Sequence, residues 1–530
     1  MNRKTFKLAS VTGAIALALG SQAQAFTPFV STYTPTPPSS VNIYMSGGSA
    51  PSNMFRENII QNNCDLSSND VDVFMDAIKN AGALVPGSAL PAPEHTNYWA
   101  VACHPKSAAG LTTTAYIVSK TDAGGSGNGT TPVVNKLQLG FMNLTSSCSL
   151  AVASQPIVGN ITHNYRLWTC GSTGTSLQVP DMGVSDIEPS AFVGELAPAS
   201  GDFPSVVPAN WKTAAGPGLI FGVIVTKNLR DTLQHMQFPG HEGDDSSDYM
   251  PSLPSTVVQG LLSGKYSDWT QVTVNGQTIP ATPWSGTLAD TGINICRRVK
   301  GSGTHAQFMK QFNRTGCQSG TQSMLGEPGD GFGNTVYENS DAGVLDNCLA
   351  AINDGTSYTN AQVFFNGTHT VPGTGGAGGH YGIGYQSTEK NASLALNTRF
   401  IKIDGNAPIA LNAFNGNYSD MYFQSINHRA NEYVGGGTNI RPANLTGSAN
   451  TDAEKIATHF FATSPATTAV INTAFKFGTG ASAWQGGYLQ PTEAVAAGTA
   501  YSAANPITQW VRTTPDYSAP DSCSPLSYWQ

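Results

Sequence analysis

The chain has 530 residues, a formal net charge of -8 at neutral pH and only 11% charged side chains, and 57 of its residues are glycine. A chain with an excess of acidic residues offers no broad basic surface, so a nucleic-acid partner is not expected. The length exceeds what one hydrophobic core usually organises, which predicts two lobes. No internal repeat is visible.

The first 25 residues have the pattern of a secretory signal peptide. Three basic residues precede an apolar stretch over residues 8–19, and residues 23–25 read Ala-Gln-Ala, a small-residue cleavage site. No cysteine follows the apolar stretch where a lipoprotein would be acylated, and no later stretch is apolar for long enough to span a bilayer. Because the leader holds three cations and no acid, the rest of the chain carries -11. We expect a periplasmic or secreted protein with no membrane span.

All eight cysteines lie after the leader, and an even number in an exported chain favours disulfides. None of them forms a Cys-x-x-Cys pair, so the spacing gives no support to a metal site. Proximity in the sequence favours a bridge between Cys64 and Cys103 and another between Cys148 and Cys170. For Cys296 a buried thiol is the alternative to a disulfide.

Strands and helices alternate along the chain, often with a glycine-rich turn between them. The predicted elements are a strand at 41–45, a glycine turn at 46–51, a helix at 53–60, a strand at 114–119, a glycine turn at 124–131, an apolar stretch at 179–186 that ends in an acid, a strand buried on both faces at 219–226, a helix that begins near 253 and ends near 264, and a helix at 344–352. This alternation predicts α/β layers.

The segment from residue 294 to 312 is the most informative of the chain. Residues 294–296 end a buried strand, residues 301–304 read Gly-Ser-Gly-Thr, and apolar residues at 308, 309 and 312 then repeat with helical spacing. The first N–H groups of such a helix have no partner within the helix and favour a negative ligand. Arg298 adds a fork suited to a tetrahedral oxyanion. The segment therefore predicts an anion cradle, and the alternative is an ordinary surface turn with a helix cap.

The order of these segments resembles that of the periplasmic phosphate-binding protein of the phosphate ABC transporter, in the type 2 periplasmic-binding superfamily. The resemblance extends over most of the chain after the leader. The matching segments are residues 44–51 (YMSGGSAP), 183–186 (GVSD), 221–226 (FGVIVT), 261–269 (LLSGKYSDW), Arg298 with 301–304 (GSGT), and 382–385 (GIGY).

The resemblance implies an α/β, two-lobe type 2 periplasmic-binding-protein fold with an enlarged N-terminal lobe. The implied organisation is a signal peptide at 1–25, lobe I at 26–223, lobe II at 224–412 and the C-terminal part of lobe I at 413–530. It also implies an exported solute-binding protein, not an enzyme, that binds inorganic phosphate or a related tetrahedral oxyanion between the lobes. An ABC permease is the implied protein partner, and no cofactor is expected.

The resemblance implies eight ligand-binding residues and neither catalytic nor metal-binding ones. They are Ser49 and Ala50 as backbone N–H or hydroxyl donors, Ser126 in the second loop, Asp186 as the acceptor acid, Arg298 as the cationic clamp, and Ser302, Gly303 and Thr304 as the cradle. A buried Asp186 accepts a hydrogen bond from the proton of monohydrogen phosphate, whereas fully ionised sulfate has no proton to offer. The alternatives are a helix N-cap for Asp186 and a surface or interlobe ion pair for Arg298.

Two departures from the family pattern bear on this hypothesis. Lys300 stands where the family usually has an acid, and residues 65–106 and 131–176 are extra, either as decorative loops or as an interaction surface. An acidic segment at 241–248 lacks the twelve-residue calcium loop and is interpreted as solvated. The functional alternatives are a secreted phosphatase that uses the same cradle, for which the sequence has no clear motif, and a surface or extracellular interaction protein that retains the fold.

Overall fold

The computed structural model describes residues 40 to 528 except 69, 79–92, 94, 107–114, 145–147, 158–159, 172, 318–333, 360–361, 366–377, 389–395, 430–486, 492–499, 503–506 and 515–518. The predicted signal peptide lies outside the described residues. None of the helices in the described part of the chain is long and apolar enough to cross a membrane.

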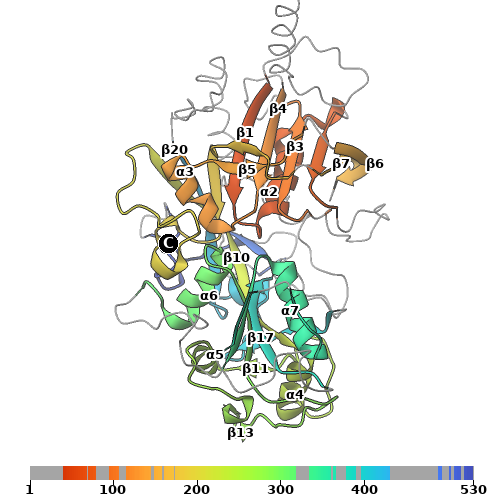
Figure 1. Ribbon diagram of the computed structural model, residues 1–530, viewed down its shortest axis with the longest axis vertical. Helices are drawn as coiled ribbons and strands as arrows, with labels where there is room; N and C mark the ends of the chain where they lie inside the picture. The colour runs from red at the N-terminus through yellow and green to blue at the C-terminus, as the bar shows by residue number, and fades with distance from the viewer. Residues whose placement is uncertain are drawn as a thin grey trace, which may run out of the picture.

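In the described part of the chain, a large mixed sheet of sixteen strands runs through the molecule (Figure 1). Its strands are β1 (Ser40–Gly47), β2 (Asp72–Met75), β3 (Tyr98–Cys103), β4 (Ala115–Thr121), β6 (Cys148–Ile157), β7 (Asn160–Cys170), β9 (Met182–Ser185), β10 (Trp211–Thr226), β14 (Asn294–Arg298), β15 (Thr335–Asn339), β16 (Gln362–Phe365), β17 (Gly382–Ser387), β18 (Thr398–Phe400), β20 (Met421–Arg429), β21 (Tyr488–Pro491) and β22 (Ile507–Thr508).

Helices and four two-stranded sheets surround this large sheet. The α-helices are α2 (Ser52–Asn58), α3 (Thr131–Asn135), α4 (Lys227–Gln237), α5 (Ser255–Leu262), α6 (Gly303–Asn313), α7 (Ala342–Asp354) and α8 (Ala410–Phe414). The small sheets pair β5 (Leu139–Phe141) with β8 (Ser176–Gln178), β11 (Ser252–Leu253) with β19 (Lys402–Ile403), β12 (Thr273–Val274) with β13 (Gln277–Thr278), and β23 (Trp510–Val511) with β24 (Ser527–Tyr528).

The two halves of the sheet repeat one arrangement of strands. In one half β1 lies between its parallel neighbours β4 and β9, and β9 pairs antiparallel with β20. In the other half β14 lies between its parallel neighbours β15 and β17, and β17 pairs antiparallel with β10. The strands β10 and β20 pair with each other and join the two halves. Figure 1 shows the resulting upper and lower lobes with β10 between them, so the predicted two-lobe α/β architecture is confirmed.

The long strand β10 passes from one lobe to the other. Its first five residues pair with β20 beside β9, whereas residues 221–225 pair with β17. From Gly216 to its end the strand is buried, as the apolar stretch 219–226 predicts. One of the hydrophobic clusters includes Ile43 and Val184 of the first lobe together with Ile295 and Ile383 of the second. The domain boundaries at 223/224 and 412/413 stay predictions.

The extra residues of the N-terminal lobe extend the sheet. Segment 65–106 supplies β2 and β3, segment 131–176 supplies β6 and β7, and the sheet continues from β4 in the order β3, β2, β7, β6. The parallel pairing of β2 with β7 brings the two insertions together. The alternative that these residues are decorative loops is therefore wrong for their described parts, and the enlarged N-terminal lobe is confirmed.

Four disulfides join segments that the sequence separates. The two predicted bridges, Cys64–Cys103 and Cys148–Cys170, are present and both belong to the enlarged part of the first lobe. A third, Cys296–Cys348, ties β14 to α7, so the thiol alternative for Cys296 is wrong. The fourth joins Cys317, just after α6, to Cys523 near the end of the chain.

Candidate anion-binding site

Two glycine loops of the predicted site, the one after β1 and the one before α6, leave the carboxyl end of a central strand. β1 ends at Gly47 and leads through a short loop into α2, while β14 ends at Arg298 and leads through residues 299–302 into α6. Each central strand has parallel neighbours on both of its sides, which is the strand arrangement at a topological switch point of an α/β sheet. In open α/β sheets, ligands bind at these switch points.

Asp186 and Ser126 form the centre of the candidate site. The Ser126 hydroxyl donates a hydrogen bond of 2.8 Å to Asp186 Oδ2, and the Asp186 N–H donates one of 3.2 Å to Ser126 Oγ. Asp186 is only 3% exposed. Its second oxygen, Oδ1, is buried and has no hydrogen-bond partner among the described residues. A buried carboxylate oxygen without a donor is costly, which makes this atom a candidate acceptor for a hydrogen bond from a ligand.

Two glycines allow both loops to approach this pair. A Cβ placed on Gly48 would lie 3.0 Å from both Asp186 Oδ1 and Ser126 Oγ. A Cβ placed on Gly303 would lie 2.8 Å from Asp186 Oδ2 and closer still to Ser126 Oγ. A Cβ would be tight at Gly48 and would force a shift of its neighbours at Gly303, so the loop after β1 and the first residue of α6 meet Asp186 and Ser126 directly.

The amino end of α6 is a second source of donors. Ser302 caps the helix, and its hydroxyl accepts a hydrogen bond of 3.4 Å from the His305 N–H. The N–H groups of Gly303 and Thr304 come first in the helix and have no acceptor within it. Ser302 and Thr304 are both buried. The loop before α6 also touches the first lobe, because the Gly127 N–H donates a bond of 2.7 Å to the Gly301 carbonyl.

Two neighbouring arginines at the end of β14 contact different groups. Arg298 is buried, and its Nη2 donates a 2.7 Å hydrogen bond to the Ser340 carbonyl. Arg297 forms a 2.9 Å ion pair with Glu338. For Arg298 the surface or interlobe ion pair stays an alternative. Lys300 is exposed, so its charge stands in solvent near the cradle.

Burial dominates the electrostatics of Asp186. Removal from water raises its pKa to about 6, while the Ser126 hydrogen bond and the positive charges of Arg298 and Lys120 act in the opposite direction. The nearby Asp122 adds to the rise. The N-cap alternative for Asp186 is wrong, because the short 3-10 helix that follows begins at Pro189 and has Glu188 as its N-cap.

The predicted residues of the first loop, Ser49 and Ala50, form hydrogen bonds to groups other than Asp186 and Ser126. Ser49 is partly exposed and its carbonyl accepts a bond from the Ser52 N–H, while the Ala50 carbonyl accepts one of 2.7 Å from the Tyr488 hydroxyl. The structure thus brings Ser126, Asp186 and Gly303 into contact. Ligand binding by the eight predicted residues stays a prediction.

A buried polar network next to the first loop was not predicted from the sequence. Lys120 Nζ donates a 2.8 Å hydrogen bond to the Gly48 carbonyl and contacts Asp122, whose other oxygen lies 2.7 Å from His95 Nε2. A lysine and an aspartate two residues apart, directly before the glycine turn at 124–131, were a signal for the first two residues. No pattern pointed to His95, which belongs to the extra segment 65–106.

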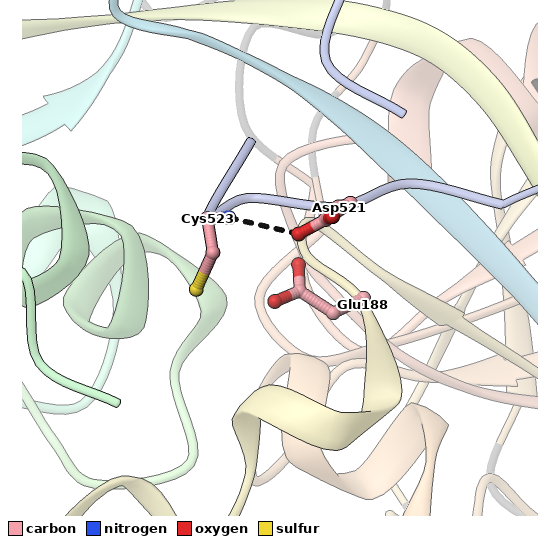
Figure 2. A group of neighbouring side chains, drawn as sticks. All are labelled: Glu188, Asp521 and Cys523. Carbon is pink, nitrogen blue, oxygen red and sulfur yellow. Dashed lines mark hydrogen bonds between the residues drawn. The ribbon is translucent and has the colours of Figure 1, made fainter. Parts of the chain in front are cut away.

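One group of potential metal ligands occurs in the described part of the chain, and Figure 2 shows its members, Glu188, Asp521 and Cys523. The Cys523 sulfur is already bonded to another cysteine. Glu188 accepts hydrogen bonds from Ser522 and lies 3.3 Å from Lys310 Nζ. These ligand atoms are engaged in protein contacts, and the group serves to join the chain end to α6.

The acidic segment 241–248 also makes protein contacts. Asp245 lies 2.7 Å from Arg399 Nε, and Glu242 contacts His235. The interpretation of this segment as simply solvated is therefore incomplete.

Comparisons with known proteins add structural matches but no sequence match. No family model matches the chain, and no curated protein matches it. The solved structures to which it is similar include PstS from Borrelia burgdorferi (10% identity, 81% of this chain and 96% of that one, TM-score 0.31). They also include an ABC-type phosphate transport receptor from Vibrio cholerae (11%, 55% and 78%, TM-score 0.29) and a phosphate-binding protein from Stenotrophomonas maltophilia (14%, 57% and 81%, TM-score 0.27).

These structural matches are consistent with the fold that the strand order gives. Because the identities and TM-scores are so low, what this chain binds is inferred from the geometry of the site.

Proposed function

We propose that the protein is an exported solute-binding protein that binds inorganic phosphate, or a related tetrahedral oxyanion, between its two lobes. The observation that carries the proposal is the buried Asp186 Oδ1, which has no donor in the described part of the chain and lies against Gly48 of the first loop, while Gly303 lies against the other carboxylate oxygen. Such an atom is suited to accept the proton of monohydrogen phosphate.

The surrounding groups supply hydrogen-bond donors and a positive charge for the other oxygens of the anion. The amino end of α6 offers the N–H groups of Gly303 and Thr304 together with a favourable dipole. The Ser302 and Thr304 hydroxyls add donors, and Arg298 adds a positive charge that is fully desolvated when the lobes close. A dianion held by these groups is stabilised by several hydrogen bonds, the helix dipole and one full positive charge.

Contacts between the lobes support binding by closure. The Gln307 side chain on α6 donates to the Asp186 carbonyl, and Lys310 on the same helix pairs with Glu188 of the first lobe. An anion that bridges the loop after β1 and the start of α6 would strengthen this closed arrangement. A carrier that closes around its ligand in the periplasm would deliver it to an ABC permease, which is the partner we propose.

Calorimetry and thermal unfolding of the protein from residue 26 onward test the proposal. We expect one phosphate per chain and an added stability of about 2.7 kcal/mol at a hundredfold excess over the dissociation constant. Sulfate should compete poorly at neutral pH and better as the pH falls through about 6, where Asp186 takes up a proton. No binding of any tetrahedral oxyanion would refute the proposal and favour the interaction-protein alternative. Hydrolysis of a phosphate ester would instead favour the phosphatase.

A further inference from the structure

Lys120 lies directly behind the first glycine loop. Its ammonium group is fully buried and donates to the Gly48 carbonyl at 2.8 Å, to the Gly47 carbonyl at 3.4 Å and to the Ser52 hydroxyl at 2.7 Å. A buried ammonium with several oxygen partners holds those oxygens at defined positions. The loop between β1 and α2 is therefore anchored from one side.

This anchoring determines where the next N–H group points. The peptide bonds of the described residues are all trans. The Gly48 carbonyl and the Ser49 N–H therefore lie in one peptide plane and point in opposite directions. With the carbonyl held by Lys120, the Ser49 N–H points away from the lysine. The preceding N–H, of Gly48, is already bonded to the Val184 carbonyl at 2.8 Å. The Lys120 anchor thus fixes the direction of the Ser49 N–H, the next donor of the loop.

A chain of buried side chains holds Lys120 in turn. Arg56 Nη1 lies 3.4 Å from His95 Nδ1, and His95 Nε2 lies 2.7 Å from Asp122 Oδ2. Arginine can only donate, so His95 accepts through Nδ1 and donates through Nε2, which is the pattern of a neutral imidazole. Burial likewise lowers the pKa of His95. Asp122 also accepts from the Ser52 hydroxyl at 2.7 Å and contacts Lys120.

Lys120 also acts on Asp186 through its charge. The positive charges that face Asp186 are Arg298 of β14 and Lys120 of β4, and the negative one is Asp122, next to the end of β4. Burial makes the charged form of each group expensive, so removal of one of them changes how readily Asp186 takes up a proton.

We propose that Lys120 is a positioning residue of the anion site, which orients the Ser49 N–H through the Gly48 carbonyl and keeps Asp186 ionised in its role as proton acceptor. The extra segment 65–106 takes part in this arrangement, since its His95 anchors Asp122. The inference rests on the proposed function and adds to it a residue that selects for an anion carrying a proton.

The test compares phosphate and sulfate binding by wild type, Lys120→Met, Lys120→Gln and the control Lys106→Gln at several pH values. Lys106 also donates to a backbone carbonyl, that of Gln61 at 2.7 Å, and its loss should leave both affinities unchanged. Lys120→Met should weaken phosphate binding by about tenfold or more, because it removes a charged donor. Lys120→Gln, which keeps a donor, should recover part of the affinity.

The pH dependence separates positioning from a merely structural role. Without the Lys120 charge, sulfate should begin to compete at a pH about half a unit or more above that of the wild type. Ser52→Ala, which keeps the charge and loses one anchor, should weaken phosphate binding without this shift, and it serves if the Lys120 variants do not fold.

The outcomes of the test are distinct. Wild-type protein that binds no oxyanion refutes the proposed function itself. Wild-type protein that binds phosphate, together with Lys120 variants of unchanged affinity and pH profile, refutes the role of Lys120 alone. If the Lys120 variants do not fold, Ser52→Ala with unchanged affinity refutes it.

Discussion

Ser126 and Asp186 exchange two hydrogen bonds, one of 2.8 Å from the serine hydroxyl to the carboxylate and one of 3.2 Å from the aspartate N–H to the serine oxygen. This exchange fixes the carboxylate plane and occupies Oδ2. The other oxygen, Oδ1, faces the Gly48 backbone without a donor in the described part of the chain. The two carboxylate oxygens therefore have different roles, one structural and one available to a ligand.

The raised pKa of Asp186 predicts how phosphate-free protein responds to pH. The folded state holds this proton more tightly than the unfolded state, since the pKa rises from 3.8 to about 6. The stability that protonation contributes is present at low pH and is lost as the pH rises through about 6. A shift of about two units corresponds to about 3 kcal/mol. We therefore expect Asp186→Asn, in the absence of phosphate, to unfold at higher denaturant concentration than wild type at pH 8.

At pH 4 the same variant should lose most of its added stability over wild type, because wild-type Asp186 is then largely protonated in the folded state. Chemical unfolding at both pH values measures the difference. Sulfate binding by the variant should depend little on pH, because the amide does not titrate and does not repel sulfate. An equal stability difference at pH 4 and pH 8 would contradict the assignment of a raised pKa to Asp186.

The two arginines of β14 give a matched pair for mutation. Arg298→Ala should weaken phosphate binding by at least about 2 kcal/mol, roughly thirtyfold, because it removes a charged donor from a desolvated anion. Arg297→Ala should instead lower the stability, since it leaves Glu338 without its partner, and should change affinity little. Calorimetry and thermal unfolding of both variants separate the effects. Equal losses of affinity would mean that both charges act on the ligand only at long range.

The sequence predicts the loops and side chains that form the candidate site better than the residues that hold them in place. The glycine loops and Asp186 come directly after strands, and Arg298 is the last residue of one. Local patterns of glycine, apolar and charged residues mark such places. The Cys317–Cys523 bridge spans 206 residues, and no local pattern indicates its partners. His95 meets Asp122 only because β3 and β4 pair antiparallel, and that pairing involves an extra segment. Such contacts depend on tertiary structure.

Gly303 provides a steric test of the closed site. Alanine there would place its Cβ 2.8 Å from Asp186 Oδ2 and against the Ser126 hydroxyl, closer than Cβ atoms approach other atoms in folded proteins. One of the two side chains, or α6 itself, would have to move. We expect Gly303→Ala to fold, because alanine favours helices, and to weaken phosphate binding by about tenfold or more.

The control for this prediction is Gly343, which lies in the first turn of α7 as Gly303 lies in that of α6. A Cβ on Gly343 would meet only Asp341 Oδ1, at an ordinary 3.4 Å. Gly343→Ala should therefore keep the affinity and gain a little stability from the higher helix propensity of alanine. If Gly303→Ala binds phosphate as tightly as Gly343→Ala, then the start of α6 does not lie against Asp186 when the anion is bound, and the anion does not bridge the two loops.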